Sequence, residues 1–360
     1  ANIRKYFDPT RLQQISGVGH FTFNTLYKFI WLRENRPDIL DKTVHWLFIS
    51  SLINHRLTGV FSTDRTMAGT SQMFDLAKDE FSEEILGKVG IAKSLFPKIV
   101  NPGEVIGQLH ADAAQLLGLP VGIPVTSAGH DTQFALFGSG AGMNQPVLSS
   151  GTWEILMART AQVDTASLSG FAESTCELDS ASGLYNPGLQ WLASGVLEWV
   201  KETCWKGANP GEVYAQMIAE ANAVAAGCDG VRMVPDLLVG GGGVGGGAFS
   251  GLSINTSRGH LYRATLEALS AKLAHQLHEL ERICGFKAEE LILVGGGSKN
   301  RLWNQIKADA LKIPVRVVAE NEMTVLGAAL YGFCGLGYYP TPQAASAVVS
   351  HDYQVYHPAS

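Results

Sequence analysis

Asp131 lies at the junction of a predicted strand and a predicted helix. The apolar run 124–127 is typical of a buried strand, and the amphipathic stretch 132–137 is typical of a helix. A carboxylate held at such a junction can accept the proton of a substrate hydroxyl, as a general base does in phosphoryl transfer. Aspartate is also a favoured N-cap residue of helices, and the position alone favours a cap over a base.

Two hydroxyl side chains flank a glycine at Ser150, Gly151 and Thr152, directly after a short apolar strand. Hydroxyls and backbone amides are groups that bind phosphate oxygens. Serine and glycine are also the commonest turn residues, and threonine favours strands. Taken alone, this segment therefore predicts an ordinary hairpin.

Three consecutive glycines, Gly295, Gly296 and Gly297, follow the apolar run 291–294 and precede a predicted helix over 300–311. Bare backbone lets a flat or charged ligand approach closely, and a helix N-terminus offers unpaired N–H groups. A tight chain reversal would need glycines as well. The segment leaves a nucleotide site and a simple turn as alternatives.

The longest glycine run, 240–247, is interrupted only by Val244. No helix follows it directly, and no acidic residue lies at the distance expected in a dinucleotide-binding unit. We expect a mobile loop there. The chain also has no glycine pair followed by Lys and Ser or Thr at the spacing of a phosphate-binding loop.

The composition is that of a large globular protein. Its 360 residues suffice for about two domains, with 46% hydrophobic and only 17% charged residues. The formal net charge of −6 argues against nucleic acid as a partner, because such proteins present a basic face. Five widely spaced cysteines, an odd number, indicate reduced thiols, and no apolar run approaches the roughly 18 residues that span a bilayer. We expect a cytoplasmic protein with no membrane partner.

The elements that position these residues change character along the chain. The first third reads as mostly helical, with amphipathic stretches at 26–34, 46–57 and 83–86. A small polar break at 142–144 precedes the strand that leads to Gly151, and we place a domain boundary between residues 141 and 142.

The second unit follows an alternating α/β pattern. One helix face is marked by leucines at intervals of three and four, and Gly285 is well placed to end that helix. These leucines are Leu266, Leu269, Leu273, Leu277 and Leu280. The strand 291–294, the helix 300–311 and a strand over 315–319 follow in order. A last glycine-rich helix is predicted over 324–335.

Two longer patterns resemble the signatures of the FGGY family of carbohydrate kinases. The first is Phe23, Thr25, Lys28, Phe29, Trp31, Leu32, Glu34 and Asn35; the second is Gly247, Phe249, Gly251, Leu252, His260, Leu261, Ala264, Thr265, Leu266 and Glu267. The resemblance covers nearly the whole chain. It implies an α/β, ribonuclease-H-like fold of the actin-like ATPase type with two lobes. Residues 1–141 would belong to the sugar-binding lobe and 142–360 to the nucleotide-binding lobe.

The resemblance also implies an activity: ATP-dependent phosphorylation of a ketose, with L-fuculose first and L-rhamnulose or D-xylulose as alternatives. Asp131 matches the family's general base, and His130 and Thr132 beside it would contact the sugar. The loop of Ser150, Gly151 and Thr152 would face the ATP phosphates. The glycines Gly295, Gly296 and Gly297, with Asn300, would hold the adenosine.

The implied partners are the sugar and ATP, with Mg²⁺ carried by the nucleotide and not by protein ligands. A homo-oligomer is left open. A second class of function, a non-catalytic actin-like module whose cleft closure moves a partner, is left open as well.

One departure from the family is that its members open with a strand hairpin bearing Asp, Gly and Thr or Ser, the first phosphate loop, followed by sugar contacts. The present 360 residues start within the first lobe, which is therefore expected to be incomplete. We expect this chain alone to be inactive, because half of the phosphate clamp and most of the sugar contacts are missing from it.

Overall fold

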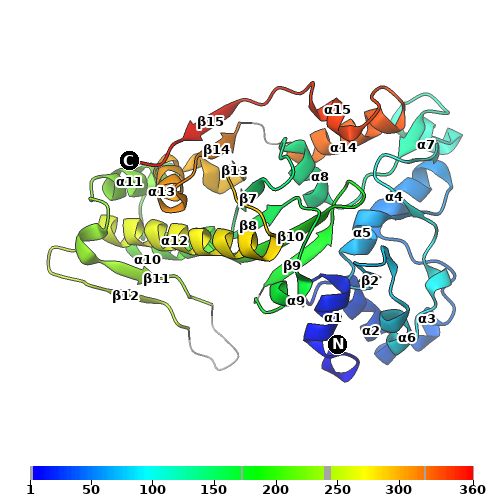
Figure 1. The fold of residues 1–360 in the computed structure, drawn as a ribbon, viewed down its shortest axis with the longest axis horizontal. Helices are drawn as coiled ribbons and strands as arrows, with labels where there is room; N and C mark the ends of the chain where they lie inside the picture. Colours follow the sequence, from blue (N-terminus) through cyan, green and yellow to red (C-terminus); the bar gives the residue numbers. More distant parts are fainter. Residues whose placement is uncertain (1–2, 172, 239–244, 320–321, 360) are drawn as a thin grey trace.

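A seven-stranded sheet forms the centre of the molecule (Figure 1). The computed structural model describes residues 3–171, 173–238, 245–319 and 322–359. From one edge of the sheet to the other, the strands are β15 (Tyr353–Tyr356), β14 (Val315–Val318), β13 (Leu291–Val294), β7 (Pro146–Ser150), β8 (Trp153–Ala158), β10 (Tyr185–Leu192) and β9 (Ser174–Leu178).

The sheet combines a parallel and an antiparallel part. Strand β13 pairs in parallel with both β14 and β7, with Ile292 opposite Val147. Strands β8, β10 and β9 continue from β7 as antiparallel neighbours. Parallel neighbours require a crossover connection, and helix α13 (Arg301–Leu311) provides it between β13 and β14. The predicted strand, glycine turn, helix and strand are therefore present in that order.

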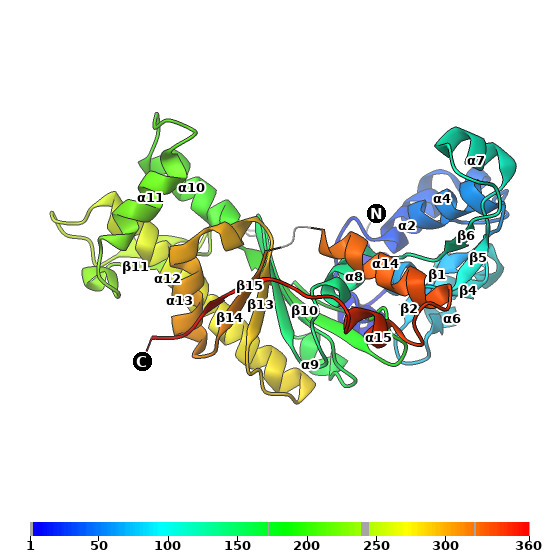
Figure 2. The same ribbon diagram turned by 90° about the horizontal axis from the view of Figure 1, so that it is seen from above.

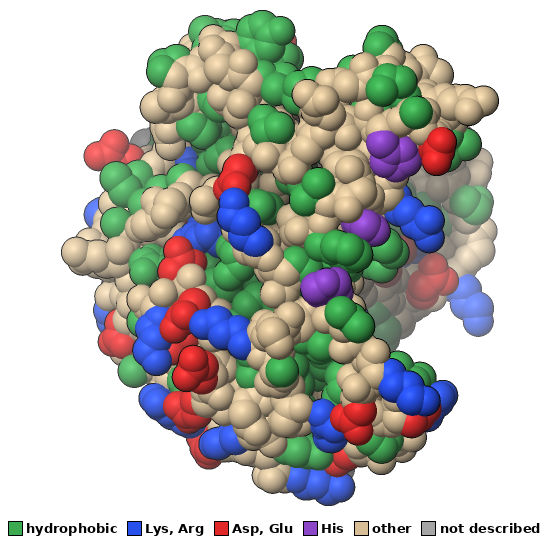
Figure 3. All heavy atoms as spheres, turned by 90° about the vertical axis from the view of Figure 1, so that its right-hand side faces the viewer, with side chains coloured by type: hydrophobic (Ala, Val, Ile, Leu, Met, Phe, Trp, Pro, Cys, Tyr) green, Lys and Arg blue, Asp and Glu red, His purple; other side chains and the backbone are tan. Residues whose placement is uncertain are grey.

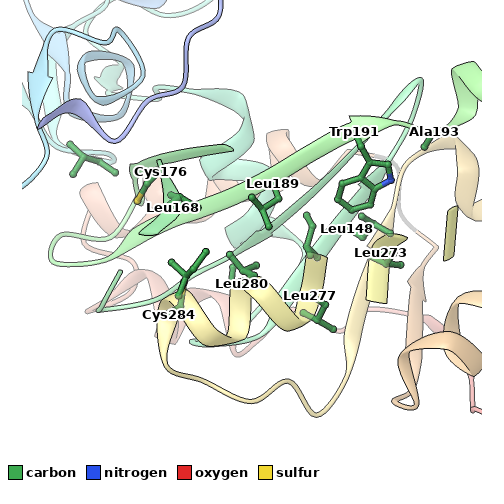
Figure 4. Packing of buried hydrophobic residues seen from close by; sticks show 14 of the residues in the cluster. Leu148, Leu168, Cys176, Leu189, Trp191, Ala193, Leu273, Leu277, Leu280 and Cys284 are labelled. Carbon is green, nitrogen blue, oxygen red and sulfur yellow. The ribbon is translucent and has the colours of Figure 1, made fainter. Parts of the chain in front are cut away.

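Helix α12 (Arg258–Cys284) supplies much of the core that covers the sheet. All five leucines of the predicted face are buried. Figure 4 shows Leu273, Leu277 and Leu280 beside Leu148 and Leu189 of the strands. Gly285 ends the helix with a φ of 67°, in the left-handed region that favours glycine. This part of the sequence prediction is confirmed.

The other elements of this region lie around the sheet, with α10 and α11 at the end away from the first 141 residues and α12 running from that end towards the middle of the molecule (Figure 2). The helices are α9 (Thr165–Leu168), α10 (Ser194–Cys204), α11 (Val213–Asn222), η3 (Cys228–Gly230), η4 (Gly296–Lys299), α14 (Met323–Gly335) and α15 (Pro342–Ser346). Strands β11 (Arg232–Val234) and β12 (Ala248–Ser250) form a separate antiparallel pair. Residues 240–244 of the predicted mobile loop lie outside the described residues.

Helices are the main regular elements of the first 138 residues, in line with the prediction. Their helices are η1 (Ile3–Lys5), α1 (Pro9–Ser16), α2 (Thr25–Asn35), α3 (Pro37–Leu40), α4 (Ile49–Thr58), α5 (Arg65–Gly69), α6 (Glu83–Val89), η2 (Lys93–Leu95), α7 (Ala111–Leu117) and α8 (Asp131–Gly138). Three short strand pairs join them: β1 (Thr63–Asp64) with β4 (Ile99–Val100), β2 (Phe74–Asp75) with β3 (Glu80–Phe81), and β5 (Val105–Gln108) with β6 (Pro124–Thr126).

Two predictions in this part need correction. The helix expected over 46–57 begins only at Ile49, because the backbone of Phe48 before it is extended, with φ −65° and ψ 159°. The strand expected over 124–127 exists as β6 but is not a buried strand. It pairs only with β5, and its residues are exposed or half-buried, whereas Ser127 after it is buried.

Helices α8 and α14 meet at very close range. A Cβ on Gly138 would lie 2.0 Å from the carbonyl oxygen of Met323, and one on Gly327 would lie 2.0 Å from that of Phe134. Only glycine at these two positions allows the helices to approach so closely. The glycine-rich helix predicted over 324–335 is present as α14, and its close partner is α8. The boundary between residues 141 and 142 stays a prediction.

The surface of the first 141 residues carries mixed charges. Figure 3 shows basic and acidic side chains intermingled over the lower part of this end of the molecule, and apolar side chains among uncharged ones over the upper part. Exposed apolar side chains of α4 and α7 include Ile49 and Leu116.

Candidate functional site

Asp131 is the first residue of helix α8. The N-cap of this helix is His130, whose side chain makes no capping hydrogen bond. The Asp131 carboxylate is 78% exposed, and its Oδ1 accepts a hydrogen bond of 2.8 Å from the backbone N–H of Thr132. The N-cap interpretation of Asp131 is therefore wrong. The carboxylate stands at the positive end of the helix dipole, where negative charge is stabilised.

A buried network holds the loop that precedes this helix. Asp64, the N-cap of α5, is 1% exposed and accepts from the hydroxyls of Thr66 and Ser127, both at 2.5 Å. Oγ1 of Thr66 in turn accepts from the backbone N–H of His130 at 2.8 Å. A Cβ on Gly129 would lie 1.8 Å from Oδ1 of Asp64. The loop therefore lies directly on the network and requires glycine at this point.

The ring of His130 is held by Gln133. Nδ1 of His130 lies 2.6 Å from Oε1 of Gln133, whose own amide donates to Oε2 of Glu177 at 2.6 Å. Because the Gln133 carbonyl only accepts, Nδ1 of His130 must carry the proton. Whenever the ring is neutral, Nε2 is an acceptor, and no partner lies on it among the described residues. Nδ1 is 3.6 Å from Oδ1 of Asp131, so the ring and the carboxylate are neighbours.

The three predicted sugar-contacting residues thus lie together at the start of α8. Thr132 is half-buried, and its hydroxyl is 3.4 Å from Oδ1 of Asp131. Their supports, Asp64 and Glu177, were not singled out from the sequence. The order Asp64, Arg65, Thr66 is a helix N-cap pattern that could have indicated Asp64, whereas Glu177 lies on a distant strand and carries no such signal.

Residues 151–152, here called the hairpin turn, connect β7 and β8. The hairpin expected at this place is confirmed. Thr152 is exposed, but Ser150 is fully buried and its hydroxyl donates to Oε1 of Glu154 at 3.0 Å. The Ser150 side chain therefore points into the protein, and only Gly151 and Thr152 of this predicted loop are open to a ligand.

Residues 295–297, here called the glycine turn, lie against the end of β7. Gly295 has a φ of 91°, and a Cβ on it would lie 2.7 Å from the carbonyl oxygen of Ser150. A Cβ on Gly297 would lie 2.2 Å from Oγ of Ser150, whereas one on Gly296 would meet no described atom within 4 Å. The turn is thus a place of close backbone approach, with open space at its middle residue.

Asn300 joins the glycine turn to helix α13. Its Oδ1 accepts from the backbone N–H of Trp303 at 3.1 Å and so caps the helix, and its Nδ2 donates to the hydroxyl of Tyr262 at 3.2 Å. Burial raises the pKa of the Tyr262 phenol, which keeps it protonated. Asn300 thereby fixes an aromatic side chain of helix α12 next to the glycine turn.

The hairpin turn and the glycine turn open onto one cavity of about 470 Å³. Its walls combine apolar side chains with the backbone of the two turns, as expected of a site for a flat ligand with a charged tail. The lining residues are Gly151, Thr152, Ser194, Leu197, Glu198, Tyr214, Ile218, Tyr262, Gly296, Gly297, Lys299, Asn300 and Trp303. Five of the seven predicted ATP-binding residues are among them, and Ser150 and Gly295 are not.

Acidic and basic groups meet at the rim of this cavity. Glu198 accepts hydrogen bonds from the hydroxyl of Tyr214 and from Nζ of Lys201. The bond to Glu198 raises the pKa of the Lys201 ammonium, so this group is charged. Glu198 and Tyr214, on helices α10 and α11, were not predicted, because nothing in their spacing relates them to the two turns.

A buried ion pair lies behind the two turns. Nζ of Lys307, on α13, is 2.6 Å from Oε1 of Glu154, on β8, and both side chains are 0% exposed. Glu154 also accepts from Nε1 of Trp191 at 3.1 Å, and Lys307 lies 3.4 Å from the ring centre of Trp303. Burial lowers the pKa of Lys307, while Glu154 opposes this change.

Two other features of the described residues bear on function. They contain no group of three or more His, Cys, Asp or Glu side chains placed to hold a metal ion. None of the helices formed by them is both long enough and apolar enough to cross a membrane.

Sequence comparison defines the class of the protein. The N-terminal domain of the FGGY family of carbohydrate kinases matches residues 1–138, and the C-terminal domain of the same family matches residues 147–336. The chain belongs to the FGGY family of carbohydrate kinases, as the two signatures predicted.

L-fuculokinases are among the most similar relatives by sequence within this family. The L-fuculokinase of Escherichia coli K12 is 58% identical over 357 residues, which cover 99% of this chain and 74% of the relative. The L-fuculokinase of Haemophilus influenzae is 43% identical over 96% of this chain and 73% of the relative. The crystal structure of xylulose kinase from Rhodospirillum rubrum is 25% identical with a TM-score of 0.86, covering 99% of this chain and 72% of that one. The predicted ribonuclease-H-like, two-lobed sugar kinase fold is confirmed.

Proposed function

We propose that this protein transfers the γ-phosphoryl group of ATP to a ketose, and that the ketose is L-fuculose, giving L-fuculose 1-phosphate and ADP. The observation that carries the choice of sugar is the 58% identity with an L-fuculokinase over 99% of the chain. The xylulose kinase structure, at 25% identity, supports the fold and the reaction class more than the choice of sugar.

Asp131 acts as the general base in this proposal. Its carboxylate accepts the proton of the sugar C1 hydroxyl while the hydroxyl oxygen bonds to the γ-phosphorus and the bond from that phosphorus to ADP breaks. The exposure of the carboxylate and the buried network beneath it support this role, because a base must be both reachable and held in place.

His130 and Thr132 contact the sugar beside the base. With Nδ1 bonded to Gln133, His130 offers Nε2 as an acceptor for a sugar hydroxyl. The hydroxyl of Thr132, half-buried at the same helix end, can either donate or accept. Together the two side chains orient the ketose so that its reacting hydroxyl meets Asp131.

ATP occupies the cavity between the hairpin turn and the glycine turn. Gly151 and Thr152 face the phosphates, while Gly296, Gly297 and Asn300 hold the adenosine against the apolar wall. Ser150 and Gly295 contribute by shaping these turns. Mg²⁺ enters with the nucleotide and neutralises charge on the phosphates. Since ATP is the co-substrate, we place the protein in the cytoplasm, with residues 1–141 and 142–360 forming the two lobes that close over both substrates.

The test is ADP release by the full-length protein with Mg-ATP and, in turn, L-fuculose, L-rhamnulose, D-xylulose, D-ribulose and glycerol. We expect L-fuculose to give the highest kcat/KM. A higher value for another ketose would move the assignment to that sugar. If no sugar raised turnover above background, the kinase proposal would be overturned in favour of a non-catalytic actin-like module.

A further inference from the structure

Stability alone does not explain why Glu154 and Lys307 form a buried ion pair. Removing two charges from water costs more than their attraction commonly returns, so apolar residues of similar size would hold the fold equally well or better. Both side chains are nevertheless completely buried, 2.6 Å apart, in the layer between the sheet and helix α13. Neither reaches the cavity, so neither can touch a ligand directly.

The contacts of the pair lead to the two turns that line the cavity. Oγ of Ser150 donates to Oε1 of Glu154 and lies 3.4 Å from Nζ of Lys307. Ser150 is the last residue of β7 and directly precedes the hairpin turn. The same Oγ is the atom that a Cβ on Gly297 would meet at 2.2 Å. One serine, whose hydroxyl is held by the ion pair, therefore directly precedes the hairpin turn and packs against the glycine turn.

Helix α13 adds a second connection. Lys307 is one helical turn after Trp303, and its ammonium lies 3.4 Å from the centre of that ring. Trp303 lines the cavity, and its backbone N–H donates to Oδ1 of Asn300, the residue that caps helix α13. The ion pair thus ties the helix that begins at the glycine turn to the strand that follows the hairpin turn.

We propose that Ser150, Glu154 and Lys307 form a positioning cluster that sets the spacing of the hairpin turn and the glycine turn, and through them the alignment of the ATP phosphates. The inference rests on the proposed function for the site of ATP, but not on the identity of the sugar. The three residues are positioning residues, since they act through the backbone of the turns.

The test uses the double variant Glu154→Gln/Lys307→Met, which removes both charges and keeps an acceptor for Trp191. We expect it to fold, because no unpaired charge is left buried. Its Kd for Mg-ADP, measured by calorimetry without sugar, should rise about tenfold, and its kcat/KM for ATP should fall roughly 10- to 100-fold at an unchanged KM for the ketose. Ser150→Ala, a small change, should raise the Kd for Mg-ADP several-fold in the same direction.

A matched control is the buried pair Arg159 and Asp179, 2.8 Å apart, whose side chains are 6% and 0% exposed and which does not line the cavity. Arg159→Met/Asp179→Asn likewise leaves no unpaired charge buried, and it should leave the Kd for Mg-ADP unchanged. A folded Glu154→Gln/Lys307→Met or Ser150→Ala protein that binds Mg-ADP with the parent Kd would overturn the proposal. Because this readout contains no sugar, a failure of the cluster and a failure of the ketose assignment give different results.

Discussion

Gln133 donates to Glu177 at 2.6 Å, and this bond joins helix α8 to strand β9 of the central sheet. The orientation of the Gln133 amide in turn fixes which nitrogen of His130 carries the proton. Gln133→Leu should therefore raise the KM for the ketose about tenfold with little change in the KM for ATP, because His130 would lose its orientation. Glu177→Gln, which keeps an acceptor for Gln133, is the control and should stay near the parent. Equal rises in both KM values would contradict this role of Gln133.

Asp131→Asn should lower kcat by roughly 10²- to 10⁴-fold, the range that a general base contributes. The amide is nearly the same size as the carboxylate, so the Kd for Mg-ADP should not change, and the charge lost at the helix start should lower stability by only about 0.3–1 kcal/mol. The control is Asp112→Asn, an exposed aspartate in the first turn of α7. Steady-state kinetics and calorimetry of both variants check this. A kcat of Asp131→Asn within twofold of the parent would exclude the base.

Gly129→Ala should destabilise the protein by about 1–3 kcal/mol or more, because the new methyl group would overlap Oδ1 of Asp64 and Oγ1 of Thr66. Gly87→Ala, in helix α6, is the opposite case. Its Cβ would meet no described atom within 4 Å, so the change should stabilise by up to about 1 kcal/mol. Urea denaturation gives the free energy of unfolding of each variant. Similar values for the two variants would refute the steric argument.

Asn300→Ala should cost about 1 kcal/mol of stability through the lost cap of α13 and should also raise the KM for ATP. Asn300→Asp keeps the cap but loses the amide that donates to Tyr262. If this amide positions the cavity wall, Asn300→Asp should show the KM effect at nearly normal Tm. If both variants kept the KM for ATP of the parent, Asn300 would have no role in nucleotide binding.

The pH dependence of stability should report on Lys307. Burial lowers its pKa in the folded protein, so between that pKa and the ordinary value of about 10.4 the unfolded chain holds more protons at this residue. The free energy of unfolding of the parent should therefore rise with pH across that window relative to Glu154→Gln/Lys307→Met, by at most about 1.4 kcal/mol per pH unit. The titrating groups other than Lys307 and Glu154 are common to both proteins and cancel in the difference. Parallel pH profiles would contradict a lowered pKa of Lys307 in the folded protein.

The sequence predicted the hydrophobic core and the backbone of the site better than it predicted the side chains that hold the site residues in place. The leucine spacing of α12 and the glycine turn after β13 are local patterns, and the structure has both. The burial of β6 was predicted wrongly, because an apolar run does not reveal that its sheet has only two strands.

The partners of the site residues could not be predicted in the same way. Glu177 reaches Gln133, and Glu154 reaches Lys307, across large separations in the chain. Their types, a glutamate in a strand and a lysine in a helix, are the same as those of solvated surface residues. Ser150 shows the converse: its type suggested a ligand contact, yet its hydroxyl is buried.

The contact of Gly138 with Met323 and of Gly327 with Phe134 has a mechanical consequence. Where two helices touch through their backbones, no side-chain rotamer lies between them to absorb a displacement. We therefore expect helices α8 and α14 to move together, and Asp131 at the start of α8 to move with them. A ligand or mutation that shifts α14 should then move the carboxylate of Asp131 as well.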